Sequence, residues 1–237
     1  DRVGEITIIA LVFGLLGAKL FDIFENWSDF LVHPSDYIFS AKGLTFYGGL
    51  ICAALAIWWY ARKHKIGFWH LNDALSPTMM LAYSLGRIGC QVSGDGDWGI
   101  EAAAMPQWWF LPDWLWSFHY PNNVNNDGVL MASCDPEVYK SAIMSRMSPE
   151  DSCLKSCGFR YCHELNPKVY PTPVYETIFG LSAFALLWFN KHRFKIPGTI
   201  FFLYMILNGV ERFFIEKIRV NEKYDFLGFH WGQAQYI

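Results

Sequence analysis

Charged side chains are scarce in this 237-residue sequence, at 17% of all residues. Soluble proteins average about 25%, so the composition argues against a soluble domain. The net charge of -3 and the short, scattered basic clusters exclude the continuous basic stripe of a nucleic-acid-binding protein. No signal peptide is visible before the first apolar segment, and the chain ends at Ile237 within an apolar-aromatic stretch. We therefore expect both ends to be truncated.

Apolar and aromatic residues are abundant instead. Hydrophobic residues make up 53% of the chain and aromatic residues 18%, with 11 tryptophans. Tryptophan and tyrosine are enriched where a bilayer meets water. A helix needs about 20 mostly apolar residues to cross the hydrocarbon of a bilayer. Five segments approach this length and are predicted to be membrane helices: 5–22, 44–60, 73–92, 173–190 and 197–216.

The short loops between these segments indicate their orientation. The stretches Tyr60-Ala-Arg-Lys-His-Lys65 and Asn190-Lys-His-Arg-Phe-Lys195 are basic, whereas the loop 23–43 holds one lysine and several acids. Basic short loops stay in the cytoplasm, and the alternation of five spans puts both basic loops on that side. The polar stretch 93–172 is then extracytoplasmic. The predicted fold class is an all-α integral membrane protein, a polytopic helix bundle with an extracytoplasmic head domain.

The predicted head domain contains four of the six cysteines. They are Cys134, Cys153, Cys157 and Cys162. An even number of cysteines suits disulfides if this region faces an oxidising compartment, although the spacing of two of them also suits zinc. We favour disulfides and expect no metal. The tryptophan-rich run 108–116 lies either at the bilayer surface or in the hydrophobic core of the head.

Several ionisable residues lie in the predicted membrane helices or at their ends. An ionised group at mid-bilayer is costly, so such residues pair, face water or contact a ligand. Most of them lie toward the extracytoplasmic ends, so several helices bring charge to one level of the membrane. Arginines with intervening glutamates suit an anionic group such as phosphate or carboxylate. The candidates are Lys19, Asp22, Arg87, Glu176, Glu211, Arg212, Glu216, Lys217 and Arg219.

Two pairs among these candidates also have a purely structural interpretation. Lys19 and Asp22 are three residues apart, so they can pair with each other or extend toward the interface. Arg212 and Glu216 are four apart on one helical face and suit a structural ion pair. That pairing would still leave Arg87 in need of a partner.

Glycines surround Arg87 in the sequence. The stretch 86–99 holds five glycines in 14 residues, which lets the chain leave the helix and approach a ligand with its backbone. Irregular backbone at membrane depth is tolerated only against protein or a wet cavity. The pair Gly48-Gly49 suits either a ligand contact or close helix packing. We interpret Cys90 as a small apolar filler rather than a reactive thiol.

At these positions the chain resembles the prolipoprotein diacylglyceryl transferase family, over nearly its whole length apart from the 100–170 insertion. Four motifs in order carry the resemblance, and a further stretch resembles the start of the family's final helix. The family has seven spans, so its first helix and most of its last are expected to be missing here. The stretches are Gly43-Leu-Thr-Phe-Tyr-Gly-Gly-Leu-Ile51; Gly86-Arg-Ile-Gly89 with Ser93-Gly94-Asp95 and Trp98-Gly99; Tyr170-Pro-Thr-Pro-Val-Tyr-Glu176; Glu211-Arg-Phe-Phe-Ile-Glu-Lys-Ile-Arg219; and Trp231-Gly-Gln233.

The resemblance implies an activity. The family moves the diacylglyceryl group of phosphatidylglycerol to the thiol of a lipobox cysteine in a preprolipoprotein, forming a thioether and releasing glycerol 1-phosphate. It implies a multi-pass enzyme of the bacterial cytoplasmic (inner) membrane, with the site toward the extracytoplasmic face. The implied partners are phosphatidylglycerol, the lipobox segment and the bilayer, with no cofactor and no nucleic acid. The alternative is a transporter or channel for an anionic solute, which would use the same charges.

The resemblance also assigns roles to residues. It implies Tyr47, Arg87 and Arg212 as catalytic. Arg87 is implied again in substrate binding, together with Gly48, Gly49, Gly89, Asp95, Gly99, Glu176, Glu216 and Arg219. The chain departs from the family where Tyr47 and Tyr170 replace histidines, Cys90 and Ser93 replace asparagines, and Asp95 replaces a glutamate. These departures concern the group that takes the proton from the thiol.

The predicted organisation has three parts. Membrane helices with the Gly-Arg signature occupy the first part, the head insertion occupies the second, and membrane helices return in the third. The boundaries are 1–99, 100–172 and 173–237.

Overall fold

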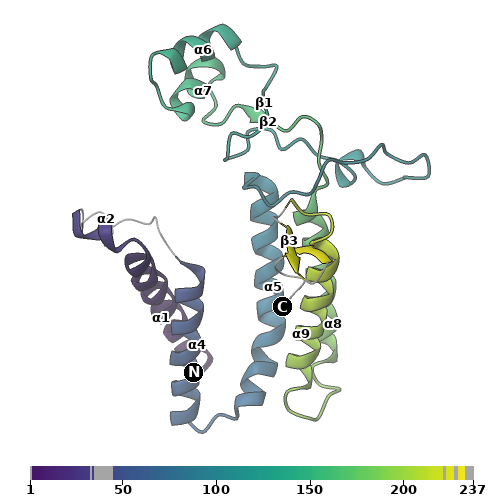
Figure 1. The fold of residues 1–237 in the computed structure, drawn as a ribbon. Coiled ribbons are helices and arrows are strands. Elements are labelled where there is room, and N and C mark those ends of the chain that lie inside the picture. Colours follow the sequence, from purple (N-terminus) through teal and green to yellow (C-terminus); the bar gives the residue numbers. More distant parts are fainter. Residues whose placement is uncertain (1, 33, 35–44, 221–222, 227–228, 233–237) are drawn as a thin grey trace. The chain divides into compact units, whose positions relative to one another are not determined.

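The computed structural model describes residues 2–32, 34, 45–220, 223–226 and 229–232. They belong to two compact units, Asp1–Asn72 and Asp73–Ile237. Figure 1 labels their elements. Gly43 and Gln233, at the ends of two of the motifs above, lie outside the described residues.

The first unit contains two helices that cross at glycines. A Cβ atom on Gly48 would meet the backbone oxygen of Gly17 and the ring of Phe21 at 2.5–2.6 Å. Small residues at such a crossing let two helix backbones approach closely. The structure therefore gives the Gly48-Gly49 pair the packing role that the sequence allowed. The helices of this unit are α1 (Arg2–Glu25), α2 (Trp27–Val32) and α4 (Phe46–Lys63).

The predicted pairing on α1 is confirmed. Lys19 Nζ lies 3.9 Å from a carboxylate oxygen of Asp22, three residues later in the helix. Asn26 also donates to Asp22 at 3.2 Å. The Asp22 side chain is buried, so these neighbours compensate a charge that would be costly alone.

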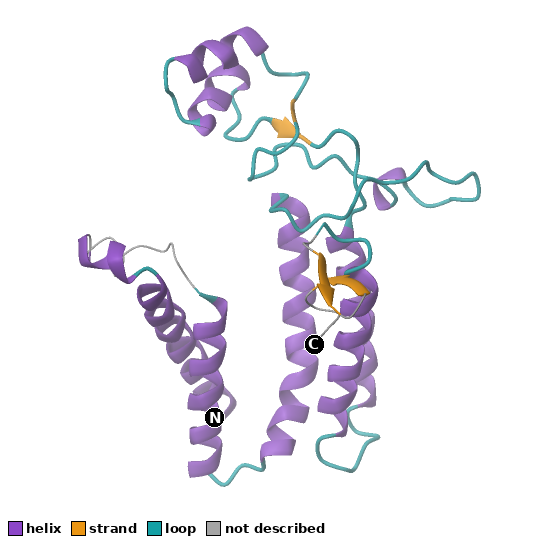
Figure 2. Ribbon diagram, viewed as in Figure 1, coloured by secondary structure: helices purple, strands orange, loops and turns teal. Residues whose placement is uncertain are grey.

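Three long helices pack together in the second unit (Figure 2). Their shared core is formed by Met80, Ala183, Leu187 and Ile200, one or two from each helix. Asp73 fastens one end of the bundle, because its carboxylate accepts from the backbone nitrogens of Gly198 and Phe201 at 2.6 and 2.8 Å. These bonds satisfy donors that a helix N-terminus leaves open. The helices are α5 (Phe68–Ser93), α8 (Thr172–Asn190) and α9 (Thr199–Ile215).

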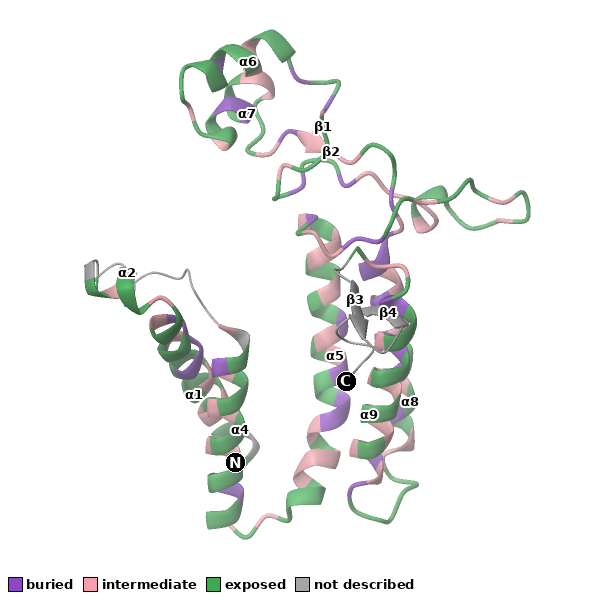
Figure 3. Cartoon of the chain, in the orientation of Figure 1, coloured by how far each residue is buried: buried purple, intermediate pink, exposed green. Residues whose placement is uncertain are grey.

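The helices turn many large apolar side chains outward. Leu85, Ile178, Phe202 and Ile206 are all more than half exposed, and Figure 3 shows exposed residues along each long helix. A bilayer accommodates such side chains, whereas water penalises them. Each of the five predicted segments contains a long helix in the described part of the chain. Two stretches, Gly4–Glu25 and Thr172–Asn190, are long and apolar enough to cross a membrane.

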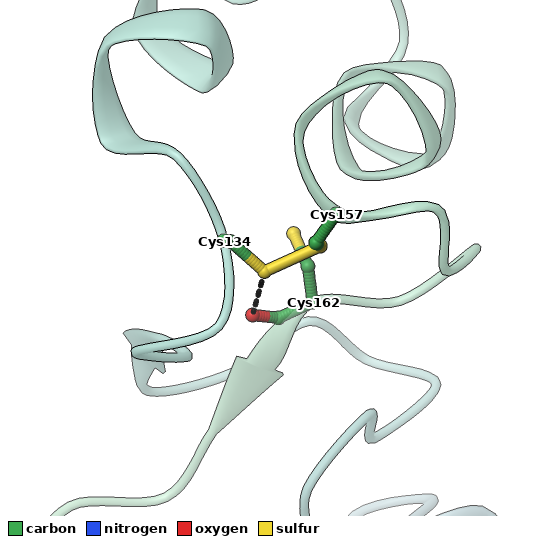
Figure 4. A group of neighbouring side chains, drawn as sticks. All are labelled: Cys134, Cys157 and Cys162. Carbon is green, nitrogen blue, oxygen red and sulfur yellow. Dashed lines mark hydrogen bonds between the residues drawn. A yellow bond between two sulfur atoms is a disulfide. The ribbon is translucent and has the colours of Figure 1, made fainter.

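The region between α5 and α8 holds the cysteines in two disulfides, Cys134–Cys157 and Cys153–Cys162. Figure 4 shows the first of these beside Cys162, whose carbonyl oxygen lies 4.0 Å from the Cys134 sulfur. The prediction of disulfides among these four cysteines is confirmed. The elements here are a 3-10 turn at Asp113–Leu115, β1 (Val129–Leu130), α6 (Pro136–Met144), α7 (Pro149–Cys157) and β2 (His163–Glu164), with β1 and β2 antiparallel.

Two predictions about local structure are wrong. Trp231 belongs to a strand, β4 (Phe229–Gly232), which pairs antiparallel with β3 (Lys223–Phe226), whereas the resemblance placed the start of a helix there. Arg87 lies inside the continuous helix α5 and not in a glycine-rich break. The break comes about two turns later, at Gly94, whose φ of 60° ends the helix. Glycine tolerates this conformation without a steric penalty.

Candidate active site

Three arginines surround one buried carboxylate where α5, α8 and α9 meet. Glu176 lies in the first turns of α8 with a side chain only 1% exposed. One of its oxygens is 2.7 Å from Arg87 Nε, on α5. The other is 3.9 Å from a terminal nitrogen of both Arg212, on α9, and Arg219, just beyond it. Because the carboxylate is shielded from water, these contacts determine where the three guanidinium groups lie.

Asp97 forms a second bridge between two of these arginines. Its two carboxylate oxygens pair separately with Arg87 and Arg219. Asp97 follows the end of α5, so it ties that helix to the segment after α9. Its side chain is 27% exposed, in contrast to the buried Glu176. The cluster therefore has one carboxylate beneath the arginines and one at its accessible edge.

Tyr83 supports the arginines from one turn earlier on α5. The guanidinium carbons of Arg87 and Arg212 lie 5.2 and 5.4 Å from the centre of its ring. Its hydroxyl donates to Glu211 at 2.9 Å, and that carboxylate is 3.8 Å from Arg212 Nε. An aromatic face attracts a guanidinium and also stacks against its plane. The ring thus restrains two arginines at once.

The backbone after α5 is fastened to the segments on both sides of the cluster. Gly99 N donates to Tyr170 O at 2.9 Å, and Ile100 N donates to Ile218 O at 2.7 Å. The hydroxyl of Thr172 donates to Asp97 O at 2.7 Å. These bonds join the glycine-rich stretch to the start of α8 and to the residue before Arg219. They hold Asp97 in place beside its two arginines.

Position 99 requires glycine because two neighbouring segments of the chain approach its backbone closely. A Cβ atom at this position would lie 2.8 Å from Ile218 O and 2.9 Å from the Tyr170 Cβ. Gly99→Ala is therefore expected to lower the free energy of unfolding by about 1–3 kcal/mol, as overpacking does. Thermal unfolding in detergent measures the change.

Gly89→Ala is the matched control for that variant. Among the described residues nothing lies within 4 Å of a Cβ atom at Gly89, and alanine favours a helix over glycine. Its melting temperature should equal or exceed that of the parent chain. Equal melting temperatures for the two alanine variants would contradict the close-packing interpretation.

The structure brings together most of the residues predicted from the second unit. Arg87, Glu176, Arg212 and Arg219 share one cluster. Glu216 is buried one turn after Arg212 on the same segment. Asp95 is exposed, and its carboxylate lies within 4.8 Å of the Cys90 sulfur and an Asp97 oxygen. Gly89 and Gly99, described above, belong to the same unit, whereas the remaining predicted residues, Tyr47, Gly48 and Gly49, belong to the first unit.

Comparison with known proteins identifies the family of the chain. The family model for prolipoprotein diacylglyceryl transferase matches residues 1–236. The chain belongs to this family. It is similar to proteins named phosphatidylglycerol–prolipoprotein diacylglyceryl transferase from Clostridium novyi (26% identical over 222 residues, 93% of this chain and 69% of the relative) and Dehalococcoides mccartyi (26% over 226 residues, 94% and 68%). A protein of the same name from Neisseria meningitidis serogroup C is 26% identical over 220 residues, 92% of this chain and 66% of the relative.

Two residues of the arginine cluster in this transferase-family chain, Asp97 and Tyr83, were not predicted from the sequence. Asp97 lies two positions after Asp95, which the motif comparison placed opposite the family's glutamate. This stretch has one residue more than the family's motif, and that extra residue was the available signal that the acidic position had shifted. Tyr83 lies one turn before Arg87 on α5, and that four-residue spacing puts both on one helix face. No motif singled it out.

Proposed function

We propose that this chain transfers the diacylglyceryl group of phosphatidylglycerol to the cysteine thiol of prolipoproteins, and that the arginine cluster binds the lipid phosphate. The observation that carries the proposal is the convergence of three guanidinium groups on Glu176, at 2.7, 3.9 and 3.9 Å. Family membership and the names of the relatives support the reaction itself. A planar guanidinium can donate two parallel hydrogen bonds to phosphate, which makes arginine suited to this task.

The charges in the cluster suggest how phosphate enters. Arg87, Arg212 and Arg219 carry three positive charges, and Asp97, Glu176 and Glu211 carry three negative ones when ionised. Glu176 and Glu211 are each 1% exposed, whereas Asp97 is 27% exposed. A phosphate group approaching from solvent would therefore compete with Asp97 for Arg87 and Arg219. Glu176 would keep both arginines aimed at the incoming group.

In the reaction, the substrate sulfur forms a bond to a glycerol carbon of the lipid as the bond from that carbon to the phosphate oxygen breaks. The thiol loses its proton, because the thiolate is the effective nucleophile, and the released glycerol 1-phosphate can take that proton up, which balances the reaction. The phosphate oxygen gains charge as it leaves with glycerol 1-phosphate. Arg87 and Arg212 are the proposed catalytic groups that stabilise this charge. Glu216 and Arg219 complete the proposed binding site, with Gly89, Asp95 and Gly99 leaving room for lipid and peptide.

Tyr47 is the third proposed catalytic residue. Its side chain is 68% exposed on the surface of the first unit. A phenol hydroxyl is a hydrogen-bond donor and a poor general base. We assign it a hydrogen bond to the phosphate, and assign Gly48 and Gly49 to the same part of the substrate site.

Tyr47→Phe is expected to lower kcat/KM about tenfold or more, because a hydrogen bond to a charged group contributes about 1.5–3 kcal/mol. The lipid-transfer assay described below measures it. Tyr161→Phe, which removes a hydroxyl from the region between α5 and α8, is the control and should retain full activity. An unchanged rate in the Tyr47 variant would remove its hydroxyl from the mechanism.

The proposed topology has five spans, with the basic loops at 60–65 and 190–195 in the cytoplasm. The boundaries 1–99, 100–172 and 173–237 then separate two membrane parts from an extracytoplasmic head. In support, Arg87, Glu176 and Arg219 lie toward the ends of α5, α8 and α9 that adjoin the disulfide-bonded region. The loop 190–195 connects the opposite ends of α8 and α9 (Figure 1). The substrate site would then face the extracytoplasmic side.

One assay tests the proposed function directly. The whole chain is reconstituted in vesicles that contain phosphatidylglycerol radiolabelled in its acyl chains, and a lipobox peptide is added. We expect label to appear in a thioether-linked peptide, and no label in a peptide whose lipobox cysteine is replaced by serine. Flux of an anionic solute through the same vesicles, without labelled peptide, would contradict the transferase and favour a transporter or channel.

A further inference from the structure

A loop between α5 and α8 exposes a cluster of large apolar side chains. This aromatic loop, residues 103–116, precedes and includes the 3-10 turn at Asp113–Leu115. Figure 3 shows it as largely exposed. Its exposed large apolar residues are Met105 (48%), Trp108 (70%), Phe110 (87%), Leu111 (43%) and Trp114 (50%). Burying these side chains against an apolar partner would be favourable, at about 25 cal/mol for each Å² of apolar surface.

The aromatic loop is fastened to the first turns of α8. The Tyr175 hydroxyl, on that helix, donates to Leu115 O at 2.7 Å. Ala103 N donates to the Tyr170 hydroxyl at 3.2 Å, and Trp116 Nε1 donates to Ala103 O at 2.8 Å. The rings of Trp116 and Tyr170 also meet edge to face, with centroids 5.6 Å apart. The base of the loop is therefore held at the end of α8 where Glu176 lies.

The length and apolar character of α8 indicate that the loop lies beside a lipid bilayer. Thr172–Asn190 is one of the two described helices long and apolar enough to span a bilayer, and Ile178 on its outer face is 53% exposed. A loop fastened at the end of such a helix is at the depth of the lipid headgroups. Figure 2 shows the loop leaving the bundle sideways, across the direction of α8, rather than continuing along it.

The composition of the loop suits that depth. Residues 102–112 contain no charged side chain, and the first charges on either side are Glu101 and Asp113. Tryptophan is enriched at membrane interfaces because its ring is apolar while its N–H remains polar. A surface that bound a soluble protein would normally have a polar or charged rim. The uncharged stretch belongs to a loop held at the end of the apolar helix α8, which favours lipid instead.

We propose that the aromatic loop inserts into the headgroup–acyl boundary of the bilayer and acts as a second membrane contact beside α8. Phe110 and Trp108 enter deepest, because they are the most exposed. The loop shares its support with the arginine cluster: Tyr170 accepts from Gly99 through its backbone oxygen and contacts the loop through its side chain. Insertion would therefore hold Arg87 and Asp97 at the depth of the lipid phosphates. The inference rests on the proposed membrane span of α8.

Photo-cross-linking tests the proposed contact. The photoreactive amino acid p-benzoylphenylalanine is placed singly at Phe110, at Ile178 or at Met144, and each whole chain is reconstituted in vesicles of phosphatidylethanolamine and phosphatidylglycerol. Met144 is the control, because it is 82% exposed but lies on α6 in the disulfide-bonded region. Ile178 reports whether α8 itself contacts lipid. Mass spectrometry of the irradiated protein counts the lipid adducts.

We expect lipid adducts at Phe110 and Ile178 at a yield about tenfold above that at Met144, because only the first two lie in or at the bilayer. Adducts at Ile178 with none at Phe110 would overturn the aromatic-loop contact while leaving the span of α8 intact. Equal yields at Phe110 and Met144 would overturn it too. When the cross-linking is repeated in native membranes, adducts at Phe110 with protein alone would also overturn it. Absence of lipid at both Phe110 and Ile178 would overturn the proposed span along with the contact.

Discussion

Arg87→Ala should reduce diacylglyceryl transfer by about 10²–10³-fold, the range seen when a donor to a developing oxyanion is removed. Arg87 is 12% exposed and contacts Glu176 at 2.7 Å, so its position is set before substrate arrives. A side chain that is already oriented needs no reorganisation when charge develops on the phosphate. Transfer of labelled lipid to the lipobox peptide, with the protein level in the membrane measured in parallel, gives the result.

Two further variants make the Arg87 result specific. Arg87→Lys keeps the positive charge but loses the planar fork, so it should restore only a small part of the activity. Arg160→Ala removes a second arginine that pairs with a glutamate, Glu150, at the same distance of 2.7 Å, but at a site 68% exposed. That variant should transfer lipid normally. Full activity in Arg87→Ala at normal protein levels would show that this residue does not handle the phosphate.

Glu176→Gln should lower both transfer activity and stability. The carboxylate is 1% exposed and lies within 3.9 Å of three arginines. Removing its charge leaves those arginines to repel one another in a site with little water, and loss of one partner from a buried ion pair costs about 3–5 kcal/mol. We expect activity to fall on the order of 10²-fold, because the arginines lose the group that aims them. Thermal unfolding and the transfer assay measure the two effects.

The matched control for that variant is Glu150→Gln, which also removes a glutamate 2.7 Å from an arginine. Glu150 is 45% exposed, and surface ion pairs contribute about 0–1 kcal/mol. Its melting temperature and transfer rate should match those of the parent chain. A Glu176→Gln protein that unfolds and transfers lipid as the Glu150→Gln protein does would refute the organising role of the buried carboxylate.

The long helices were predictable because a local property determines them. Each of the five apolar segments in the sequence is helical in the structure, since a run of apolar residues near the length of a bilayer has few alternatives to a helix. The ends of the helices were harder to predict. The helix was predicted to break around Arg87, yet it continues to Ser93, because a glycine inside a packed helix costs only about 1 kcal/mol.

The members of the arginine cluster were partly predictable for a different reason. Arg87, Glu176, Arg212 and Arg219 stand out because charge is rare in apolar segments, and family motifs contain each of them. Asp97 lies in a polar stretch among other acids, so neither its charge nor a family motif distinguishes it clearly. Only the folded backbone, with Thr172 bonded to the Asp97 carbonyl, shows which acid reaches the arginines.

The sequence by itself determined the helical membrane character, the family, and which charges needed partners. Hydropathy, residue order and the cost of an isolated charge in lipid are properties of the chain read along its length. The tertiary structure decided the partners. Glu176 lies beneath three arginines and Asp97 between two of them. Cys134 is bonded to Cys157 rather than to Cys153, the next cysteine in the sequence. Partner choice depends on distances between segments far apart in the chain, which only packing of the helices and loops establishes.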